Sequence, residues 1–447
     1  MPHRSAAVVG AGPVGCLAAL GLAERGFRVA VYEARSADAF GALAHLSQRS
    51  INLAISVRGL TAINAVLRTE DMNARILAEG LPMTARMIHT HDHGRTALQR
   101  QQYSASNEAI FSFDRARLNR LLLERVQSHA GIDVHFEHKL VNATVLDTGV
   151  ALVLGTPDGT ATCQASLLVG CDGMHSAARA AVAPLARMNT ATEYIDTEYI
   201  ELHIPPVDAA HKWALDNSCL HIWPRHDYML IALPNIDGSF TSTLFGPRTM
   251  YEQFRDPQRA AAFFRANFPD ALTVMGEENV VHFLTTRRPN SLGFVRCCPL
   301  HYGSTVVLLG DAAHAMVPFY GQGLNCGLED VRVFVELLDQ AKDIGTALAR
   351  YTTVRQDDVA AIQYLALENY VEMRHRVVSL AFRARKWLDS VLVRILPRGW
   401  WRTLYSMVTF SNIGYAHARA VEQRQQRIVS AAAAALLLGV VRLALRR

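Results

Sequence analysis

Apolar runs and one amphipathic stretch alternate over the first 33 residues of the chain. Residues 6–9 and 27–32 are apolar runs of strand length, and residues 16–25 between them carry apolar side chains at helical spacing. A glycine-rich turn separates the first run from the helix. The pattern therefore predicts a strand–helix–strand unit, with the two strands parallel in one sheet.

Alternation of apolar and polar positions, with many aromatic residues, marks a second region between about residues 186 and 290. It predicts an antiparallel sheet with one face covered. The strands are expected at residues 200–204, 220–223, 228–233 and 240–245. After residue 325 the apolar spacing becomes helical and is interrupted at Pro397 and Gly399.

Three short apolar runs lie between these regions, at residues 132–137, 141–146 and 149–154. Their close spacing predicts a meander of three neighbouring strands. A further apolar run at residues 166–170 ends in a turn and predicts another strand.

Composition supports a globular protein of two or three lobes. The chain has 447 residues, half of them apolar and 19% charged, which suffices for large cores and argues against disorder. The seven cysteines are scattered, without a Cys-x-x-Cys pair or a histidine cluster, so neither a zinc site nor a disulfide framework is expected. Scattered cysteines without a disulfide pattern are typical of a reducing compartment. We therefore expect a cytoplasmic protein without a signal peptide.

Charge is unevenly distributed along the chain. From Arg374 to the end there are fourteen Lys or Arg and two acidic residues. Residues 428–441 within this basic region are apolar or small, and a helix of that length would span about 21 Å against a hydrocarbon core of about 30 Å. We therefore expect this segment to pack on its own protein or a partner, or to contact an anionic membrane surface, rather than to span a membrane. No nucleic-acid module is visible.

The turn after the first strand has the spacing of a dinucleotide site. Gly10 suits a tight turn, Gly12 allows a pyrophosphate to approach the backbone, and Gly15 allows close packing of helix on strand. Glu33 ends the second strand, where a carboxylate binds ribose hydroxyls and disfavours a 2′-phosphate. This turn predicts an adenine dinucleotide pocket.

A second turn of related type lies about three hundred residues later. Residues 306–310 form a buried strand that ends at Asp311, and a Pro- and Gly-rich loop then leads into a helix near residue 325. Asp311 either accepts a hydrogen bond from a sugar-like hydroxyl or caps a helix. Two such turns far apart indicate one large cofactor held at both ends, and flavin adenine dinucleotide (FAD) fits.

Arg86 lies in an otherwise apolar stretch. A buried arginine needs an anionic partner, which a substrate carboxylate or an internal ion pair would provide. Asn369 and Met373 lie four residues apart on one helical face, where core packing is the alternative to a binding role. Arg115, near the start of a predicted helix, is either a solvated charge or a cofactor contact.

These motifs resemble the aromatic-hydroxylase class of single-component flavin monooxygenases, and within it the members that hydroxylate L-kynurenine. The resemblance extends from about residue 5 to residue 415. The glycine turns are common to the class. The matching segments are residues 49–54, 85–89, 220–225, 231–235, 311–319, 321–325, 368–373 and 405–411. Among them, the segments at residues 220–223, Asn369 and Tyr405 are far more specific to the kynurenine hydroxylases.

The resemblance implies a mixed α/β and α+β fold like that of para-hydroxybenzoate hydroxylase. A discontinuous FAD-binding domain of Rossmann type would comprise residues 1–80, 104–185 and 290–365. An inserted β domain for the substrate would comprise residues 81–103 and 186–289, followed by a helical region at 366–447.

It also implies roles for individual residues. Those expected to bind the amino-acid end of the substrate are Arg86, Tyr103, Asn369 and Tyr405. Those expected around its ring are Leu220, Ile231, Leu233, Phe245, Pro318 and Phe319, and Met373 is expected to contact the substrate. Those expected to contact FAD are Gly10, Gly12, Val14, Gly15, Glu33, Arg35, Ala54, Arg115, Leu140, Asp311, Leu324 and Asn325. Tyr320 departs from the His or Phe usual at its position.

The implied reaction is hydroxylation of L-kynurenine to 3-hydroxy-L-kynurenine, a step of tryptophan degradation. It would use non-covalently bound FAD, with NADPH and O2 as co-substrates, through a flavin hydroperoxide. No catalytic side chain and no metal are expected, because the cofactor carries the chemistry. Alternatives are a hydroxylase of another aromatic carboxylate, a flavoprotein at a membrane surface without hydroxylase activity, and a dehydrogenase that reduces quinone. We expect a monomer or a homodimer.

Overall fold

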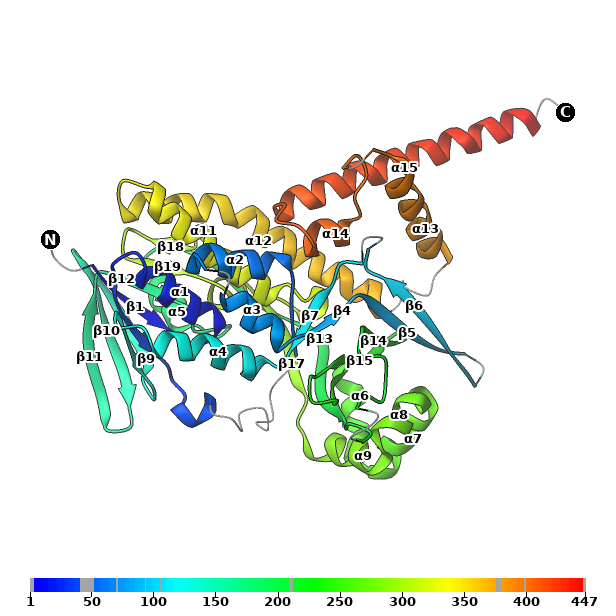
Figure 1. The fold of residues 1–447 in the computed structure, drawn as a ribbon, viewed down its shortest axis with the longest axis horizontal. Coiled ribbons are helices and arrows are strands. Elements are labelled where there is room, and N and C mark those ends of the chain that lie inside the picture. Colours follow the sequence, from blue (N-terminus) through cyan, green and yellow to red (C-terminus); the bar gives the residue numbers. More distant parts are fainter. Residues whose placement is uncertain are drawn as a thin grey trace.

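A computed structural model of the chain describes residues 4–40, 52–69, 71–92, 94–104, 107–208, 212–374, 380–397 and 399–444. Residues 49–51 of the predicted segment 49–54, and residues 445–447 of the basic tail, lie outside this part. Two lobes are joined by long strands, and a group of helices follows them (Figure 1).

The first lobe is built on a six-stranded sheet. Its strand order is β18–β19–β12–β1–β2–β8. The bounds are β1 (Ser5–Val9), β2 (Arg28–Tyr32), β8 (Ile132–His135), β12 (Leu167–Gly170), β18 (His301–Tyr302) and β19 (Val306–Leu308). All neighbours are parallel except β18 and β19, so the predicted strand–helix–strand unit is present.

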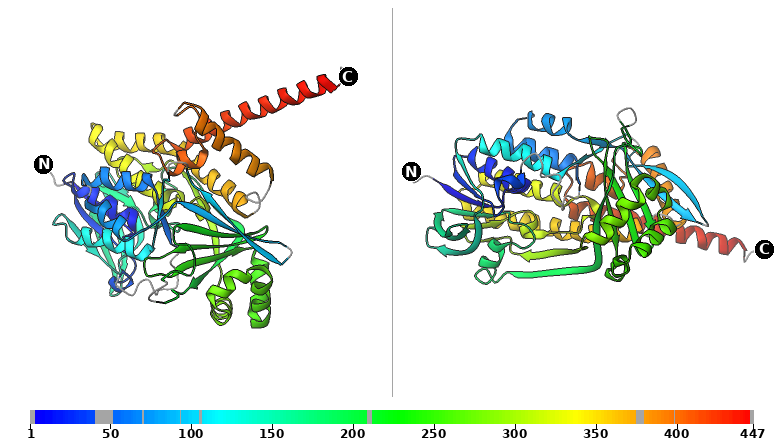
Figure 2. Two further views of the ribbon diagram at one scale, coloured as in Figure 1. Left: turned by 45° about the vertical axis from the view of Figure 1, so that its right-hand side comes forward. Right: turned by 90° about the horizontal axis from the view of Figure 1, so that it is seen from below.

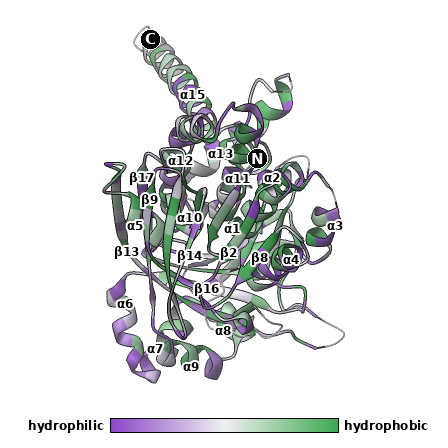
Figure 3. Cartoon of the chain, turned by 90° about the vertical axis from the view of Figure 1, so that its left-hand side faces the viewer, coloured by the Kyte–Doolittle hydropathy of each residue, from purple (hydrophilic) through white to green (hydrophobic). Residues whose placement is uncertain are grey.

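Helices cover this sheet and supply most of the lobe's core. Helix α1 (Pro13–Ala23) joins β1 to β2 and packs against α4 (Arg115–Gln127) and α11 (Gly323–Gln340). Helix α11 in turn packs on α2 (Val57–Leu67). The strands β1 and β12 are buried because helices and sheet exclude water from them, and these central elements are mostly apolar (Figure 3).

The predicted meander at residues 132–154 is wrong in one strand. Strand β8 pairs in parallel with β2, because α4 before it acts as the crossover that brings the chain back to the sheet edge. The antiparallel meander instead consists of β9 (Lys139–Leu146), β10 (Gly149–Thr156) and β11 (Gly159–Ala165).

A seven-stranded sheet forms the second lobe, in the order β17–β13–β16–β15–β14–β5–β6. The bounds are β5 (Ala85–Asp92), β6 (Arg95–Gln102), β13 (Asn189–Ile204), β14 (Cys219–Arg225), β15 (Tyr228–Pro234), β16 (Phe240–Gly246) and β17 (Asn290–Cys298). All pairs are antiparallel except β14 with β5. Strand β13 is long and runs between the lobes (Figure 2). A small sheet, β3–β7–β4, lies nearby, formed by β3 (Leu53–Ile55), β4 (Leu81–Met83) and β7 (Ile110–Phe113).

The β region predicted between about residues 186 and 290 also contains helices that were not predicted, in its last part. The chain there forms α6 (Arg248–Glu252), α7 (Pro257–Asn267), α8 (Pro269–Met275) and α9 (Glu277–Thr286). Their apolar residues, among them Phe264 and Leu284, form one buried cluster with strand residues such as Leu230. These helices are therefore the cover over one face of the seven-stranded sheet.

In the part of the chain that the structure describes, four helices follow α11. They are α12 (Ile344–Arg374), α13 (Leu380–Ile395), α14 (Leu404–Thr409) and α15 (Tyr415–Ala444). Helix α15 extends away from the two lobes (Figures 1 and 2), and Ile428 and Leu438 on it are exposed. Among the described residues, none of the helices combines the length and apolar character required to cross a membrane.

Candidate active site

The first glycine turn joins β1 to α1. Gly10 has φ +100°, and a Cβ there would lie 2.4 Å from the carbonyl oxygen of Cys171. A Cβ on Gly15 would lie 1.9 Å from the carbonyl oxygen of Gly10. Around Gly12, in contrast, a Cβ would meet no protein atom within 4 Å, and Gly12 gives α1 no side-chain cap. A ligand can therefore approach the backbone closely at Gly12, at the start of α1, as binding of an anionic group requires.

Glu33, at the end of β2, is turned toward that turn. Its carboxylate accepts hydrogen bonds from the amide of Ala11, the amide of Arg35 and the Arg35 Nε, each at 2.9 Å. Burial alone would raise the pKa of Glu33, but the charge and hydrogen bonds of Arg35 and the Ala11 amide hold it below the usual value. An ionised Glu33 is thus fixed beside the turn. Asn119 of α4, which the sequence did not reveal, donates to the Ala11 carbonyl at 3.1 Å.

The second glycine turn lies against the first. Gly310 has φ +59°, and a Cβ there would lie 3.2 Å from the side chain of Val14 in α1. Asp311 follows and opens α10 (Asp311–His314) with its side chain exposed. The structure therefore brings the two distant glycine turns together.

Asn325 joins α11 to β3. Its amide nitrogen donates to the carbonyls of Ala54 at 2.8 Å and Gly321 at 2.9 Å, and its oxygen accepts from the Ser56 amide at 2.9 Å. Helix α11 begins without a side-chain cap. A second helix N-terminus is therefore held in place beside β3 with its first amides available.

These features fit a dinucleotide cofactor. The space at Gly12, the two uncapped helix starts and the exposed Asp311 supply anion-binding and hydroxyl-binding groups over an extended path. Of the other predicted cofactor contacts, Arg115 is exposed on the first turn of α4, Leu140 is buried in β9 and Leu324 is half-buried on α11.

A buried ion network lies beneath the second turn, and the sequence did not predict it. Arg355 of α12 binds Glu329 and Asp330 of α11, each at 2.8 Å, and Asp330 also accepts a hydrogen bond from the Gly310 amide at 2.9 Å. His314 contacts the same carboxylate. Burial opposes the charge of Asp330, but His314 and Arg355 hold its pKa below the usual value. Arg58 of α2 completes the network through an ion pair with Glu329.

A mostly apolar cavity lies between the seven-stranded sheet, the loop of residues 318–322 before α11, and the helices α12 and α14. Nine of the predicted substrate residues line it: Arg86, Leu220, Ile231, Leu233, Phe245, Pro318, Phe319, Met373 and Tyr405. The predicted cofactor residue Ala54 also lines it. Other lining residues that were not predicted include Asn52, Ser56, Met83, Ile110, Gln322 and Thr409. We call this space the inner cavity.

Arg86 extends from β5 to the polar end of the inner cavity. Its side chain is 11% exposed, and its Nη1 lies 3.5 Å from Oε1 of Glu372 on α12. Its Nε is buried without a hydrogen-bond partner among the described residues. An internal ion pair, the alternative weighed from the sequence, is thus present, yet it leaves donors of the guanidinium unused.

Three tyrosines surround this guanidinium. The Arg86 guanidinium carbon lies 4.8 Å from the ring centroid of Tyr405, which stacks on Tyr103 at 5.1 Å and on Tyr320 at 5.9 Å. Burial raises the pKa of Tyr103 and of Tyr320 well above the usual value, so both phenols remain neutral. The buried hydroxyl of Tyr103 has no hydrogen-bond partner within the part of the chain described.

Asn369 has a different position from the other predicted polar residues. Its amide nitrogen donates to the carbonyl of Phe319 at 2.6 Å and lies 3.3 Å from the sulfur of Met373. Phe319 also stacks on Tyr370, with ring centroids 4.1 Å apart. Asn369 therefore anchors the loop that carries Phe319 and is not among the residues lining the inner cavity.

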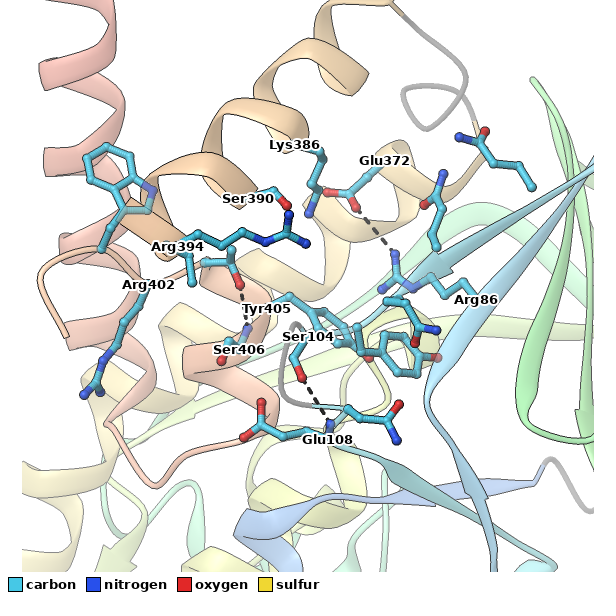
Figure 4. A pocket seen from close by; sticks show the side chains of 18 residues that line it. Arg86, Ser104, Glu108, Glu372, Lys386, Ser390, Arg394, Arg402, Tyr405 and Ser406 are labelled. Carbon is cyan, nitrogen blue, oxygen red and sulfur yellow. Dashed lines mark hydrogen bonds and ion pairs between the residues drawn. The ribbon is translucent and has the colours of Figure 1, made fainter. Parts of the chain in front are cut away.

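A second, more polar cavity adjoins the inner one at Arg86 and Tyr405 and is called here the outer cavity. Its walls come from β5 and β6, α12, α13 and α14 (Figure 4). Tyr103, Glu108 and Glu372 line it together with Lys386, Arg394 and Arg402. Arg86 thus lies where a polar opening meets an apolar pocket, which suits a ligand with an ionic end and an aromatic end.

Comparison with known proteins agrees with this geometry. Residues 4–362 match the family model described as FAD binding domain. Kynurenine 3-monooxygenase of Yarrowia lipolytica is 43% identical over 94% of this chain and 92% of its own length. That of Mycosarcoma maydis is 40% identical over 99% of this chain and 92% of its own length.

Among solved structures, 2-methyl-3-hydroxypyridine-5-carboxylic acid oxygenase superposes with a TM-score of 0.67 at 18% identity, covering 86% of this chain and 95% of that one. The p-nitrophenol 4-monooxygenase PnpA of Pseudomonas putida has a TM-score of 0.64 at 18% identity, covering 88% and 94%, and both likenesses concern the fold. The predicted mixed fold, with C-terminal helices, is confirmed.

Proposed function

The chain belongs to the FAD-binding-domain family and, within it, to the kynurenine 3-monooxygenases, and on this premise we propose how its residues bind L-kynurenine. The protein is an FAD-dependent monooxygenase that hydroxylates L-kynurenine at the ring carbon next to the aniline nitrogen. NADPH and O2 are the co-substrates of this enzyme class.

FAD supplies the chemistry, because it passes electrons from NADPH to O2 and so makes one oxygen atom electrophilic. The residues we propose to hold it are those of the two glycine turns, with Glu33, Ala54, Asp311 and Asn325. Arg35, Val14, Arg115, Leu140 and Leu324 remain proposed contacts. The protein contributes orientation and exclusion of water, and no side chain is required as a nucleophile.

Substrate orientation follows from the chemistry of the inner cavity. We propose that Leu220, Ile231, Leu233, Phe245, Pro318 and Phe319 enclose the aromatic ring. Arg86 would bind the carboxylate, with the neutral hydroxyls of Tyr103 and Tyr405 beside it. Met373 would contact the substrate from the cavity wall, and Asn369 would act through the position of the Phe319 loop. The aniline nitrogen of the substrate itself activates the ring carbon that is hydroxylated.

The position of Arg86 carries this proposal. It is a buried guanidinium with unused donors, at the boundary between an apolar cavity and a polar opening. An aromatic α-amino acid matches this arrangement, because its ring suits the apolar cavity and its charged end suits Arg86 and the polar opening.

The experiment is to mix the purified yellow protein with NADPH, air and L-kynurenine, and to measure oxygen uptake together with 3-hydroxykynurenine. Stoichiometric product supports the proposal, whereas oxygen uptake without product, or product only from another aromatic carboxylate, contradicts it.

We also propose the division of the chain expected from its sequence, with residues 81–103 and 186–289 as the substrate domain. The pairing of β5 with both β6 and β14 supports it, because it places residues 85–102 in the second sheet. Strand β4 pairs instead with β7, so the boundary belongs close to residue 84.

The far part of α15 is proposed to touch an anionic membrane surface. Its exposed apolar residues, including Ile428 and Leu438, lie on a helix that projects from the lobes and belongs to a basic region (Figure 1). The full chain should co-sediment with anionic liposomes, and a chain ending at Gln426 should remain in solution. Equal behaviour of the two chains would contradict this contact.

Size-exclusion chromatography with light scattering would distinguish a monomer from a homodimer.

A further inference from the structure

Glu372 is the acidic residue that faces the substrate arginine. It lies on α12 between Asn369 and Met373, and its side chain is 25% exposed into the outer cavity. Its carboxylate and the Arg86 guanidinium point toward each other across the junction of the two cavities (Figure 4). A substrate whose carboxylate binds Arg86 must therefore place its neighbouring groups beside Glu372.

The contact between these two groups is loose. Their closest atoms are 3.5 Å apart, whereas well-formed charged hydrogen bonds are about 2.7–2.9 Å long. The Arg355 pairs in the cofactor lobe reach 2.8 Å. Arg86 and Glu372 thus both retain capacity for a ligand, and the ligand that satisfies both must carry both signs of charge.

An α-amino acid meets this requirement, since its ammonium and carboxylate groups are bonded to one carbon atom. A simple aromatic carboxylate does not, because it can pair with Arg86 but offers no cationic group to Glu372. Lys386 and Arg394 on α13 and Arg402 line the same cavity, so the approach to Glu372 remains attractive for the carboxylate end.

We propose that Glu372 binds the α-ammonium group of the substrate and thereby selects α-amino acids over plain aromatic carboxylates. This rests on the proposed function and extends it to the specificity of the same site. Arg86 and Glu372 form a matched pair for a zwitterion, and they also pair with each other.

The test compares two ligands on the FAD-loaded enzyme. One is L-kynurenine, and the other is 4-(2-aminophenyl)-4-oxobutanoate, which has the same ring and carboxylate but no α-amino group. Binding is measured without NADPH by isothermal titration calorimetry, and KM and kcat are measured with NADPH and air. The variant is Glu372→Gln, which keeps the shape and removes the charge. Glu108→Gln, on another wall of the same cavity, is the matched control.

Glu372→Gln should weaken L-kynurenine binding by about tenfold to a hundredfold, since a charge-assisted contact is lost. The same variant should bind the desamino analogue as well as the wild type or more tightly, because Arg86 no longer has an internal counter-ion. Glu372→Asp should keep part of the preference for L-kynurenine. Glu108→Gln should leave the ratio of the two affinities unchanged.

An equal loss for both ligands in Glu372→Gln, or an unchanged ratio, would overturn the assignment of Glu372. The absorbance of bound FAD and the urea midpoint check that the variant is folded. Failure of the wild type to bind and hydroxylate L-kynurenine would instead count against the proposed function, so the two failures are distinguishable.

Discussion

The ion network beneath the second glycine turn and the cluster around Arg86 both bury an arginine, and they differ in how its charge is compensated. Arg355 has two carboxylate partners at 2.8 Å and a side-chain exposure of 1%. Arg86 has one carboxylate at 3.5 Å and an Nε without a partner in the described structure. Complete pairing maintains the fold around the cofactor, whereas incomplete pairing leaves binding capacity for a substrate.

The largest expected effect comes from removing Arg355, which has two close carboxylate partners. Arg355→Met should lower the free energy of unfolding by about 3–5 kcal/mol, because Glu329 and Asp330 lose a buried counter-ion. Urea unfolding of the FAD-free protein measures it. As a control, Arg296→Met breaks an exposed pair with Glu193 and should cost less than about 1 kcal/mol. Similar losses in both variants would remove the distinction between the two kinds of arginine.

Removing the incompletely paired arginine should affect binding instead of folding. Arg86→Ala should raise the KM for L-kynurenine, because the carboxylate of the bound substrate loses its cation. The fall in kcat/KM should correspond to a loss of about 2–5 kcal/mol in transition-state binding. Steady-state kinetics and the urea midpoint are measured together. Arg296→Ala, an exposed arginine that lines neither cavity, is the control and should retain nearly full kcat/KM. Unchanged kinetics in Arg86→Ala would refute the carboxylate site.

Acid should affect the two lobes in different pH ranges. Burial is the main reason that the pKa of His221, in β14, is lowered from 6.5 to about 4. The pKa of His221 is lower in the folded protein than in the unfolded chain, so the unfolded chain takes up the proton first as pH falls. The free energy of unfolding should therefore decrease between pH 6.5 and pH 4, by up to about 3 kcal/mol. Asp330 in the cofactor lobe has a pKa lowered below 3.8, so its contribution is lost only at still lower pH.

Urea unfolding between pH 7 and pH 4 tests this order. The variant His221→Phe should show a smaller dependence of stability on pH across this range, because it has no proton to bind at that position. An unchanged slope would show that other groups cause the acid sensitivity of the seven-stranded sheet.

The smallest effect on stability is expected at Gly12. Its φ of −70° suits any residue and a Cβ would meet no protein atom within 4 Å, so Gly12→Ala should change the stability of the FAD-free protein by less than about 1 kcal/mol. The new methyl group should nevertheless weaken FAD binding, measured by flavin fluorescence quenching. Gly15→Ala should be clearly less stable, since its Cβ would lie 1.9 Å from a carbonyl oxygen. Undiminished FAD affinity in Gly12→Ala would contradict the position proposed for the pyrophosphate.

Local patterns allowed much of the fold to be predicted. The strand–turn–helix around Gly10 and the strand that ends in Glu33 follow from apolar periodicity and glycine spacing, which act over a few residues. The helices α6 to α9 were missed, because their short amphipathic segments follow directly on strands with similar apolar content. The placement of β8 beside β2 depends on the crossover through α4. A run of four residues does not indicate which strand it will pair with in the sheet.

The candidate site shows the same limit. The apolar setting of Arg86 indicated that it needs an anionic partner, but the identity of that partner, Glu372, depends on how α12 packs against β5. Asn369 was expected at the substrate, and the structure gives its amide a loop carbonyl as partner. These are side-chain contacts between segments far apart in the chain, and no local pattern encodes them.

The sequence by itself determined the dinucleotide turns, the class of fold and the family to which the chain belongs, because backbone conformation and apolar spacing are properties of consecutive residues. Only the tertiary structure decided which charges are fully paired and which are left for a ligand. The free energy of a buried charge depends on all groups around it, and these are brought together from α2, α11, α12 and β5 only when the chain is folded.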